Sequence, residues 1–214
     1  MSISFWAGRG RTVDLMNVQP HDVAMSDLGE ALARLNRFSG RTSETWSVAA
    51  HSVLVERLCP PELGPWALLH DAHETFLGDV TSPAVDFIAR VGRVPQLHDG
   101  IAMAKGRLDR AIGAAWGVAV RSVNGSLRRA DRIALQAEAI MFLDAQPVLF
   151  EPNDDEDIDR AITLLREMPL GRGWRTDCDL WIARVEHYSH LGWMTPPSAI
   201  QPAAYSAAVF PKEH

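Results

Sequence analysis

The segment at 68–83, LLHDAHETFLGDVTSP, concentrates side chains that bind metals or move protons. Its adjacent His70-Asp71 pair, here called the HD pair, and Glu74 interrupt an apolar run that is spaced like one face of a helix. Buried histidine and carboxylate groups are costly unless a partner satisfies them, and a divalent metal is a common partner. Asp79 follows in a polar turn, directly after a glycine that ends the helical pattern. We therefore expect this segment to form part of a metal or acid–base site.

Two residues elsewhere in the chain would complete a metal site. His51 lies on the apolar stripe of a predicted helix at 47–58, and Asp131 borders the apolar face of a later helix. With the HD pair they offer two imidazoles and two carboxylates, a set that suits Mn²⁺, Fe²⁺, Co²⁺, Ni²⁺ or Zn²⁺. Each also has a plainer interpretation: His51 as a hydrogen-bonded core residue, and Asp131 as an ion-pair partner of Arg128 one turn earlier.

Arg37 and Phe38 are adjacent residues of types that suit a nucleotide. An arginine guanidinium matches the oxygens of a phosphate, and an aromatic ring suits a base or a sugar. The alternative is a last-turn arginine that faces the dipole of a predicted helix at 27–38, with the phenyl ring in the core. Glu74, one turn beyond His70 on the same face, can reach a water or leaving group near a metal.

The composition is that of an ordinary globular protein. The chain has 214 residues, 47% hydrophobic and 22% charged, which allows one substantial core in a single domain. Its formal net charge of -6 argues against a nucleic-acid polymer as partner, because such binders carry a basic footprint. Two cysteines without a CxxC pair exclude a cysteine-built zinc site and fit a reducing compartment. Because no leader-like or membrane-spanning run is visible, we expect a cytoplasmic protein without a membrane partner.

Helical periodicity dominates the chain and predicts an all-α fold of about seven or eight helices. Strand-like alternation is almost absent, and residues 1–24 look irregular. The helices are expected at 27–38, 47–58, 63–77, 83–91, 95–116, 127–143, 154–168 and 177–191, with Ser26 and either Asn124 or Ser126 as N-caps. Residues 1–195 are expected to form one domain, followed at 196–214 by a C-terminal extension rich in Pro, Ala and Ser.

The motifs SVAAHS, ALLHDAHETFLGDVTSP and RRADRIAL, in that order, resemble those of the HD-domain metal-dependent phosphohydrolases. The similarity is closest to the 5′-deoxynucleotidase branch and its phage-borne relatives, and it runs from about Leu28 to about Leu143. The resemblance implies an HD-domain helical bundle. It also implies a set of metal ligands: His51, His70, Asp71 and Asp131.

The same resemblance assigns roles around the metal. Asp71 and Glu74 become the catalytic residues, and Glu74 transfers a proton or orients a water. Arg37 would contact the phosphate and Asp79 the sugar hydroxyl, whereas Phe38 falls where the deoxynucleotidases place a tryptophan close to the sugar. The implied cofactor is one divalent transition metal (Co, Mn, Fe, Ni or Zn), with room for an additional Mg or Mn ion that accompanies the substrate. The implied partner is a small nucleotide, and a homo-oligomer is left open.

The expected activity is that of a metal-dependent phosphohydrolase acting on deoxynucleotides, with release of phosphate from deoxynucleoside monophosphates as the leading reaction. A deoxynucleoside triphosphate triphosphohydrolase is the main alternative, and it would need further basic residues near the metal, for which Arg41, Arg128 and Arg129 are candidates. An alarmone hydrolase fits less well, because those enzymes usually carry Glu-Asp where this chain has Glu74-Thr75. A helical binding module without activity would be signalled by a lost ligand, and none of the four is lost.

Overall fold

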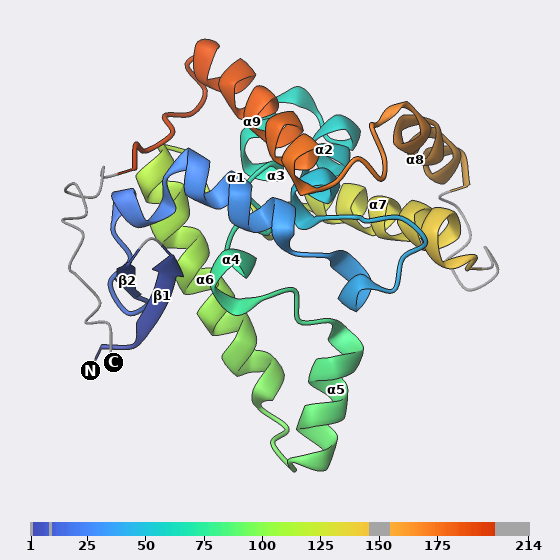
Figure 1. Cartoon of the computed structure of the whole chain (residues 1–214). Coiled ribbons are helices and arrows are strands. Elements are labelled where there is room, and N and C mark those ends of the chain that lie inside the picture. Colours follow the sequence, from blue (N-terminus) through green and yellow to red (C-terminus); the bar gives the residue numbers. More distant parts are fainter. Residues whose placement is uncertain (1, 9, 146–154, 200–214) are drawn as a thin grey trace, which may run out of the picture.

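Helix α2 (Val48–Leu58) runs through the centre of the molecule. Its residues are buried on every side from Val48 to Glu56, so it is a core helix rather than an amphipathic surface helix. Ser47 caps its N-terminus by accepting a hydrogen bond from the Ala50 amide. Five helices pack around α2 (Figure 1): α1 (Met25–Arg34), α3 (Gly64–Ala67), α7 (Gly125–Leu143), α8 (Asp155–Glu167) and α9 (Trp174–His190).

The computed structural model describes residues 2–8, 10–145 and 155–199. Over these residues it contains nine α-helices, three short 3₁₀ turns and one two-stranded sheet, so the predicted all-α architecture is confirmed. The elements not yet named are α4 (Glu74–Leu77), α5 (Ser82–Val91), α6 (Leu97–Trp116), η1 (Pro20–Val23), η2 (Arg37–Gly40) and η3 (Pro61–Leu63), besides the two strands. Residues 200–214, which make up most of the predicted C-terminal extension, lie outside the described residues.

The N-terminal residues form an antiparallel hairpin of β1 (Ser4–Gly8) and β2 (Arg11–Asp14), where an irregular segment was expected. Phe5 pairs with Val13 across the hairpin. Phe5 also packs edge-on against Phe76 at a centroid distance of 5.6 Å, which fixes the hairpin against α4. The strands are four and five residues long, so their alternation is too brief to stand out in the sequence.

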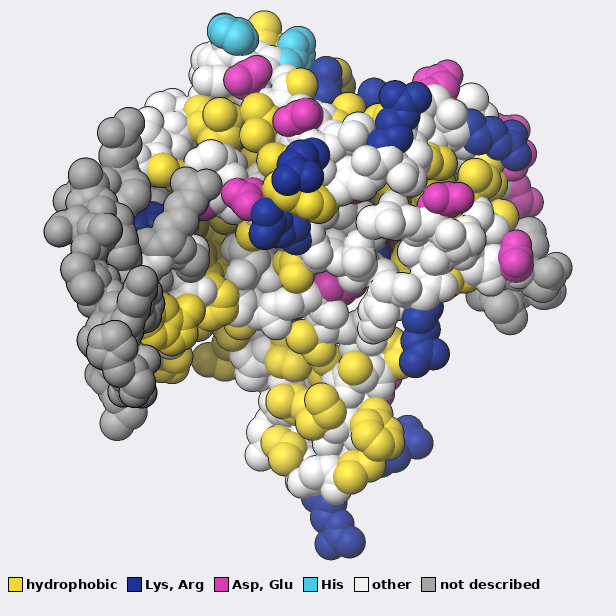
Figure 2. All heavy atoms as spheres, viewed as in Figure 1, with side chains coloured by type: hydrophobic (Ala, Val, Ile, Leu, Met, Phe, Trp, Pro, Cys, Tyr) yellow, Lys and Arg dark blue, Asp and Glu magenta, His cyan; other side chains and the backbone are white. Residues whose placement is uncertain are grey.

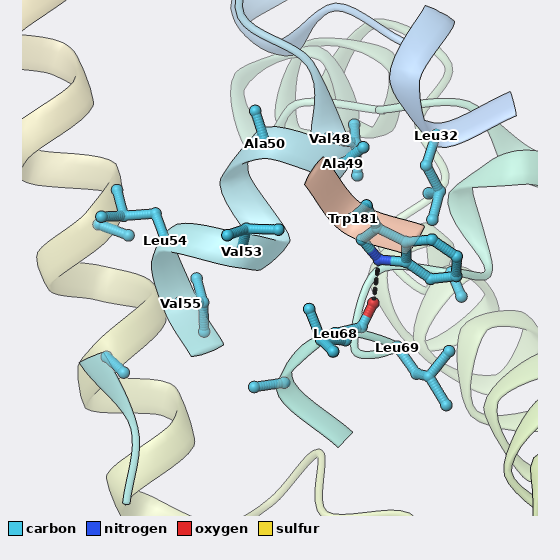
Figure 3. Close-up of a cluster of buried hydrophobic side chains, with 14 of the residues drawn as sticks. Leu32, Val48, Ala49, Ala50, Val53, Leu54, Val55, Leu68, Leu69 and Trp181 are labelled. Atoms are coloured by element: carbon cyan, nitrogen blue, oxygen red, sulfur yellow. Dashed lines mark hydrogen bonds between the residues drawn. The ribbon is translucent and has the colours of Figure 1, made fainter. Parts of the chain in front are cut away.

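Four tryptophans fill the core between the helices: Trp46, Trp66, Trp116 and Trp181. Trp181 of α9 donates its indole N–H to the Leu68 carbonyl at 2.9 Å (Figure 3). Trp116 of α6 donates in the same way to the Val23 carbonyl at 2.9 Å. Buried indole N–H groups need such partners, and the first of these bonds ties α9 to the backbone just before the HD pair.

Helices α5 and α6 form a hairpin that extends away from the helices around α2 (Figure 1). Phe87, Ile88, Val91 and Met103 expose their apolar side chains on this hairpin, and Figure 2 shows hydrophobic atoms gathered over it. None of the described helices combines the length and the apolar character that crossing a membrane requires.

Most predicted helices agree with the structure to within a few residues, but the first and the third do not. The helix predicted at 27–38 ends at Arg34, because Leu35 takes an extended conformation and Arg37–Gly40 forms a separate 3₁₀ turn. The helix predicted at 63–77 is interrupted in the middle by residues 68–73, with consequences for the candidate site.

The N-caps of α7 and α1 test two predicted helix starts. Asn124 accepts hydrogen bonds from two backbone amides at 2.9 and 3.2 Å. The N-cap of α7 is therefore Asn124 and not Ser126, the other predicted candidate. Helix α1 begins at Met25, and Ser26 therefore lies in its first turn instead of capping it.

Candidate metal centre

His51 reaches the site from the middle of α2. Its side chain is fully buried, with 0% exposure. Its Nδ1 lies 2.6 Å from Glu138 Oε1, and its Nε2 lies 3.1 Å from Asp131 Oδ1. The imidazole therefore sits between two carboxylates of α7, which fix the orientation of the ring.

The HD pair lies in a run of tight turns and not in the middle of a helix, so the continuous helix predicted at 63–77 is wrong. Between α3 and α4, several backbone amides donate to the carbonyl three residues earlier, as in a 3₁₀ turn, and not to the carbonyl four residues earlier, as in an α-helix. His70 Nδ1 lies 2.7 Å from the Ala67 carbonyl oxygen, and since that oxygen can only accept, the Nδ1–H donates; in the neutral form of the ring the lone pair is then on Nε2. Adjacent side chains of a regular helix do not face each other, yet here His70 Nε2 and Asp71 Oδ2 are 3.2 Å apart.

Asp131 enters the site from α7. It faces the two histidines, and 46% of its side chain is exposed. Arg128, its alternative partner, donates to the Ser122 carbonyl at 3.2 Å.

The structure brings the four predicted ligands close together: the ligand atoms of His51, His70 and Asp131 all lie within 4.8 Å of one another, and Asp71 lies beside both histidines. The histidine Nε2 atoms and carboxylate oxygens are separated by 3.1 Å (His51–Asp131), 3.2 Å (His70–Asp71), 3.7 Å (His51–Asp71) and 3.9 Å (His70–Asp131). Neighbouring ligands about 2.1 Å from one ion are roughly 3.0–3.5 Å apart in octahedral or tetrahedral geometry. The cluster thus has close to the spacing that a single bound ion requires.

Two further observations fit a cation at this point. His70 Nε2 is buried and has no hydrogen-bond partner among the described residues. Burial alone would raise the pKa of Asp71, but His70, His51 and Arg37 outweigh it and hold that pKa well below its usual range. Burial would likewise lower the pKa of His70, but the Asp71 and Asp131 carboxylates raise it to about 9. The carboxylates thus favour positive charge at the point where the ligands meet, and two nitrogens with two carboxylates suit a divalent transition ion.

Glu74 lies beside the four-residue cluster. Its Oε1 is 3.9 Å from Lys105 Nζ, and its Oε2 is buried without a hydrogen-bond partner among the described residues. Burial, followed by the nearby Asp71 and Asp79 carboxylates, raises the pKa of Glu74 to about 8. Glu74 can therefore hold or release a proton near neutral pH. With Asp71 and His73 it also forms a second group of possible ligands, beside the group of His51, His70 and Asp131.

A cavity of about 730 Å³ opens beside these residues. Asp71, Glu74 and Asp131 line one part of it. The rest of its lining includes every residue predicted to bind substrate, together with additional basic and apolar side chains: Arg37, Phe38, Asp79, Arg41, Lys105, Leu135 and Leu143.

Arg37 and Phe38 reach the cavity from η2, beyond the end of α1. Arg37 is 9% exposed; its Nε donates to Glu138 Oε2 at 3.0 Å and its Nη1 lies 3.8 Å from Asp71 Oδ2. It is therefore not a last-turn arginine facing a helix dipole. Phe38 and Ser39 have φ of 52° and 54°, a left-handed conformation that is uncommon outside glycine and that clusters at functional sites.

Asp79 enters the cavity from the turn between α4 and α5. Gly78 before it takes a φ of 76°, which glycine adopts at little cost. Burial raises the pKa of Asp79, although Arg37 opposes the shift. Asp79 is thus placed to hydrogen-bond a polar group that enters the cavity.

Two residues of the site were not predicted from the sequence. Glu138 is fully buried and contacts both His51 and Arg37. It lies seven residues after Asp131, two turns along the same face of α7, and this spacing is the signal that would have pointed to it. Lys105 comes from α6, and no local pattern reveals that its side chain reaches Glu74.

No protein-family model matches the chain. It is 34% identical over 142 residues to an uncharacterized protein of Rhodobacter capsulatus, an alignment that covers 61% of this chain and 68% of that protein. It is also 31% identical over 84 residues to the uncharacterized protein YfdR of Escherichia coli, where the alignment covers 39% of this chain and 47% of YfdR. The second match thus spans about half the length of that relative. Neither relative's name indicates an activity.

Proposed function

We propose that this chain, which belongs to the same family as the Rhodobacter capsulatus protein, is a divalent-metal-dependent phosphohydrolase that acts on deoxynucleotides. Its preferred reaction is the release of phosphate from deoxynucleoside 5′-monophosphates. The observation that carries the proposal is the convergence of the four candidate ligands at the wall of a cavity that also holds Arg37 and Glu74. The resemblance of the surrounding motifs to HD-domain phosphohydrolases supports the same class of reaction.

The converging histidines and carboxylates would hold one Mn²⁺, Fe²⁺, Co²⁺, Ni²⁺ or Zn²⁺ ion. When bound, such an ion supplies Lewis-acid chemistry, because it withdraws charge from a phosphoryl oxygen and makes a nearby water easier to deprotonate. His51 and His70 would offer neutral Nε2 atoms, since each ring directs its Nδ1–H away from the centre, to Glu138 and to the Ala67 carbonyl.

Glu74 is assigned to proton transfer. When Glu74 is ionised, its unpartnered Oε2 can take a proton from the water whose oxygen attacks phosphorus. When the bond from phosphorus to the 5′ oxygen breaks, the same carboxyl group can return the proton to that leaving oxygen. A pKa of about 8 keeps both forms of Glu74 populated near neutral pH.

Each of the three predicted substrate-binding residues would contact a different part of the nucleotide. Arg37 presents the guanidinium group to the phosphate from its buried position beside Asp71. Phe38 provides an apolar wall for the sugar, and Asp79 accepts a hydrogen bond from a sugar hydroxyl. A 2′-hydroxyl against an apolar wall would be buried without a partner, which favours the deoxy sugar.

A deoxynucleoside triphosphate triphosphohydrolase is the second candidate, and the basic lining of the cavity favours it. Arg41 and Lys105 both line the cavity and add to the positive charge of Arg37. The sequence offered two other arginines as possible triphosphate ligands, and both have partners outside the cavity. Arg128 donates to the Ser122 carbonyl, and Arg129 pairs with an aspartate of α8.

A screen of purified, metal-loaded protein against nucleoside mono- and triphosphates, with the released phosphate and triphosphate separated by ion-exchange chromatography, tests both candidates. The proposal expects inorganic phosphate from dAMP or another deoxynucleoside monophosphate, and lower kcat/KM for the matching ribonucleotide. The second candidate expects inorganic triphosphate and a deoxynucleoside from dATP. Equal kcat/KM for dAMP and AMP would contradict the deoxynucleotide assignment, and no hydrolysis of any nucleotide with any of the five metals would contradict the proposed function.

A further inference from the structure

Glu138 occupies a position in the structure that the reaction outlined above does not explain. It lies on α7 two turns beyond Asp131, and its side chain is 0% exposed. A buried carboxylate is costly unless charged or hydrogen-bonding partners compensate for the lost water. Two of its partners belong to different parts of the candidate site.

The first partner is His51. Glu138 Oε1 lies 2.6 Å from His51 Nδ1. A carboxylate that is paired with a guanidinium only accepts hydrogen bonds, so the proton of the neutral imidazole must be on Nδ1. The lone pair of Nε2 is then directed at Asp131 and Asp71, at distances of 3.1 and 3.7 Å.

The second partner is Arg37. Its Nε donates to Glu138 Oε2 at 3.0 Å, and this contact joins residues 101 positions apart in the chain. Because Nε is committed to Glu138, the two Nη groups are left for other partners, and Nη1 lies 3.8 Å from Asp71 Oδ2 at the cavity wall. The pairing therefore decides which edge of the guanidinium faces the substrate space.

We propose that Glu138 is a positioning residue that holds the metal ligand His51 and the phosphate-binding residue Arg37 with one carboxylate. The inference rests on the proposed function, since it assigns the two partners their roles in that reaction. Both oxygens of Glu138 accept from N–H donors, so both are needed. A glutamine at this position would offer one acceptor oxygen and one NH₂ group, and the NH₂ group would oppose an N–H of either His51 or Arg37.

The test compares Glu138→Gln with two other variants. Arg37→Gln removes the guanidinium that faces the phosphate, and with it the Arg37–Glu138 contact, but leaves the contact between Glu138 and His51 in place. Glu56→Gln is the matched control, because Glu56 is also a buried carboxylate with two partners, Arg184 and Tyr188, but neither partner is a candidate ligand or lines the cavity. Circular dichroism and thermal melts establish that each variant is folded.

Two direct binding measurements separate the roles. Co²⁺ affinity is measured by competition with a fluorescent chelator, and binding of inorganic phosphate to the Co²⁺-loaded protein by calorimetry. We expect Glu138→Gln to weaken Co²⁺ binding by roughly 10–100-fold and phosphate binding by roughly tenfold. Arg37→Gln should weaken phosphate binding but lower Co²⁺ affinity far less than Glu138→Gln does, because the His51–Glu138 contact remains, and Glu56→Gln should change neither affinity.

Unchanged Co²⁺ and phosphate affinities in Glu138→Gln, with an active wild type, would overturn this inference and leave the proposed function standing. Wild-type protein that binds no Co²⁺ would overturn both. If Glu138→Gln does not fold, Glu138→Asp carries the test, because the shorter carboxylate cannot keep both contacts. Wild-type affinity for both probes in Glu138→Asp would then overturn the inference.

Discussion

Glu74 combines burial, an oxygen without a partner and a pKa raised to about 8, the properties of a group that exchanges a proton with substrate. We expect Glu74→Gln to lower kcat by about 10²–10⁴, because the amide can neither take nor deliver that proton. Metal content, measured by elemental analysis, should stay at the wild-type level.

Loss of metal in the Glu74→Gln protein, with activity falling in proportion, would show that Glu74 is a ligand and not the proton-transfer residue. That outcome would favour the second ligand group, in which Glu74 joins Asp71 and His73.

Phe38 is the residue to which sugar selectivity is assigned. An apolar contact of this kind discriminates by roughly 10–100-fold, and Phe38→Ala should reduce the preference for dAMP over AMP accordingly. Parallel kcat/KM measurements with the two nucleotides check it, with Co²⁺ affinity as the control. An unchanged ratio would remove Phe38 from the sugar site.

The residue chemistry of the site could be predicted more fully than its geometry. His51, His70, Asp71 and Asp131 were singled out because their side chains share metal-binding chemistry, and the structure places them together. The spacing of Glu138 from Asp131 could have pointed to that residue, but the inward position of Arg37 depends on a contact with Glu138 across 101 positions, for which the sequence contains no periodic signal.

At the scale of the elements, periodicity predicted where helices occur but not how they are interrupted. The apolar spacing continues from Trp66 through Leu77, so a single helix was expected there. Hydrogen bonds to the third residue back break that helix at 68–73 and leave the side-chain pattern almost unchanged. The break shapes the candidate site, because it brings the side chains of the HD pair to within 3.2 Å of each other.

The N-cap of α2 supports the helix that carries His51. Ser47 accepts from the Ala50 amide at 3.1 Å and donates to Asp177 at 2.7 Å, and both contacts are buried. We expect Ser47→Ala to lower the free energy of unfolding by about 2 kcal/mol, because it removes a cap and leaves a buried carboxylate oxygen without its donor. Urea denaturation measures the change.

Asn124→Ala is the matched control for the Ser47 variant. Asn124 caps α7 with comparable hydrogen bonds at a partly exposed position, so its loss should cost only about 1 kcal/mol. Equal losses in the two variants would mean that the Asp177 contact adds nothing to the stability of the fold.

At the scale of the whole molecule, the net charge of -6 does not reveal that three basic side chains gather beside the carboxylates of one cavity. Arg37, Arg41 and Lys105 line one cavity although they come from separate parts of the chain. Composition could exclude a broadly basic surface, but it could not show this arrangement. The core depends equally on distant segments, since α9, beyond the region of motif resemblance, contributes the buried Trp181.

The two cysteines provide a probe of how metal binding and global stability are connected. Both are free; burial raises the pKa of Cys59 to about 12, helped by Glu56 and Asp131, and burial likewise raises the pKa of Cys178. Only a thiolate reacts with iodoacetamide, so at pH 8 the folded protein should be labelled mainly when it unfolds, when these pKa values return to about 8.5.

A metal that binds the folded state alone should therefore slow labelling. At a free Mn²⁺ concentration 100 times its Kd, the folded state gains about 2.7 kcal/mol, which lowers the unfolded population and the labelling rate about 100-fold. Mn²⁺ is the suitable probe because it binds thiolates weakly and would not protect unfolded cysteines. His70→Ala, which lacks one candidate ligand, should be labelled at nearly the same rate with Mn²⁺ and with chelator.

If Mn²⁺ does not slow labelling of the wild type, either the cysteines are labelled through local opening or the cluster around His70 does not bind the ion. Urea-induced unfolding followed with and without Mn²⁺ separates these explanations, because only the first leaves the metal-dependent rise in the unfolding midpoint intact.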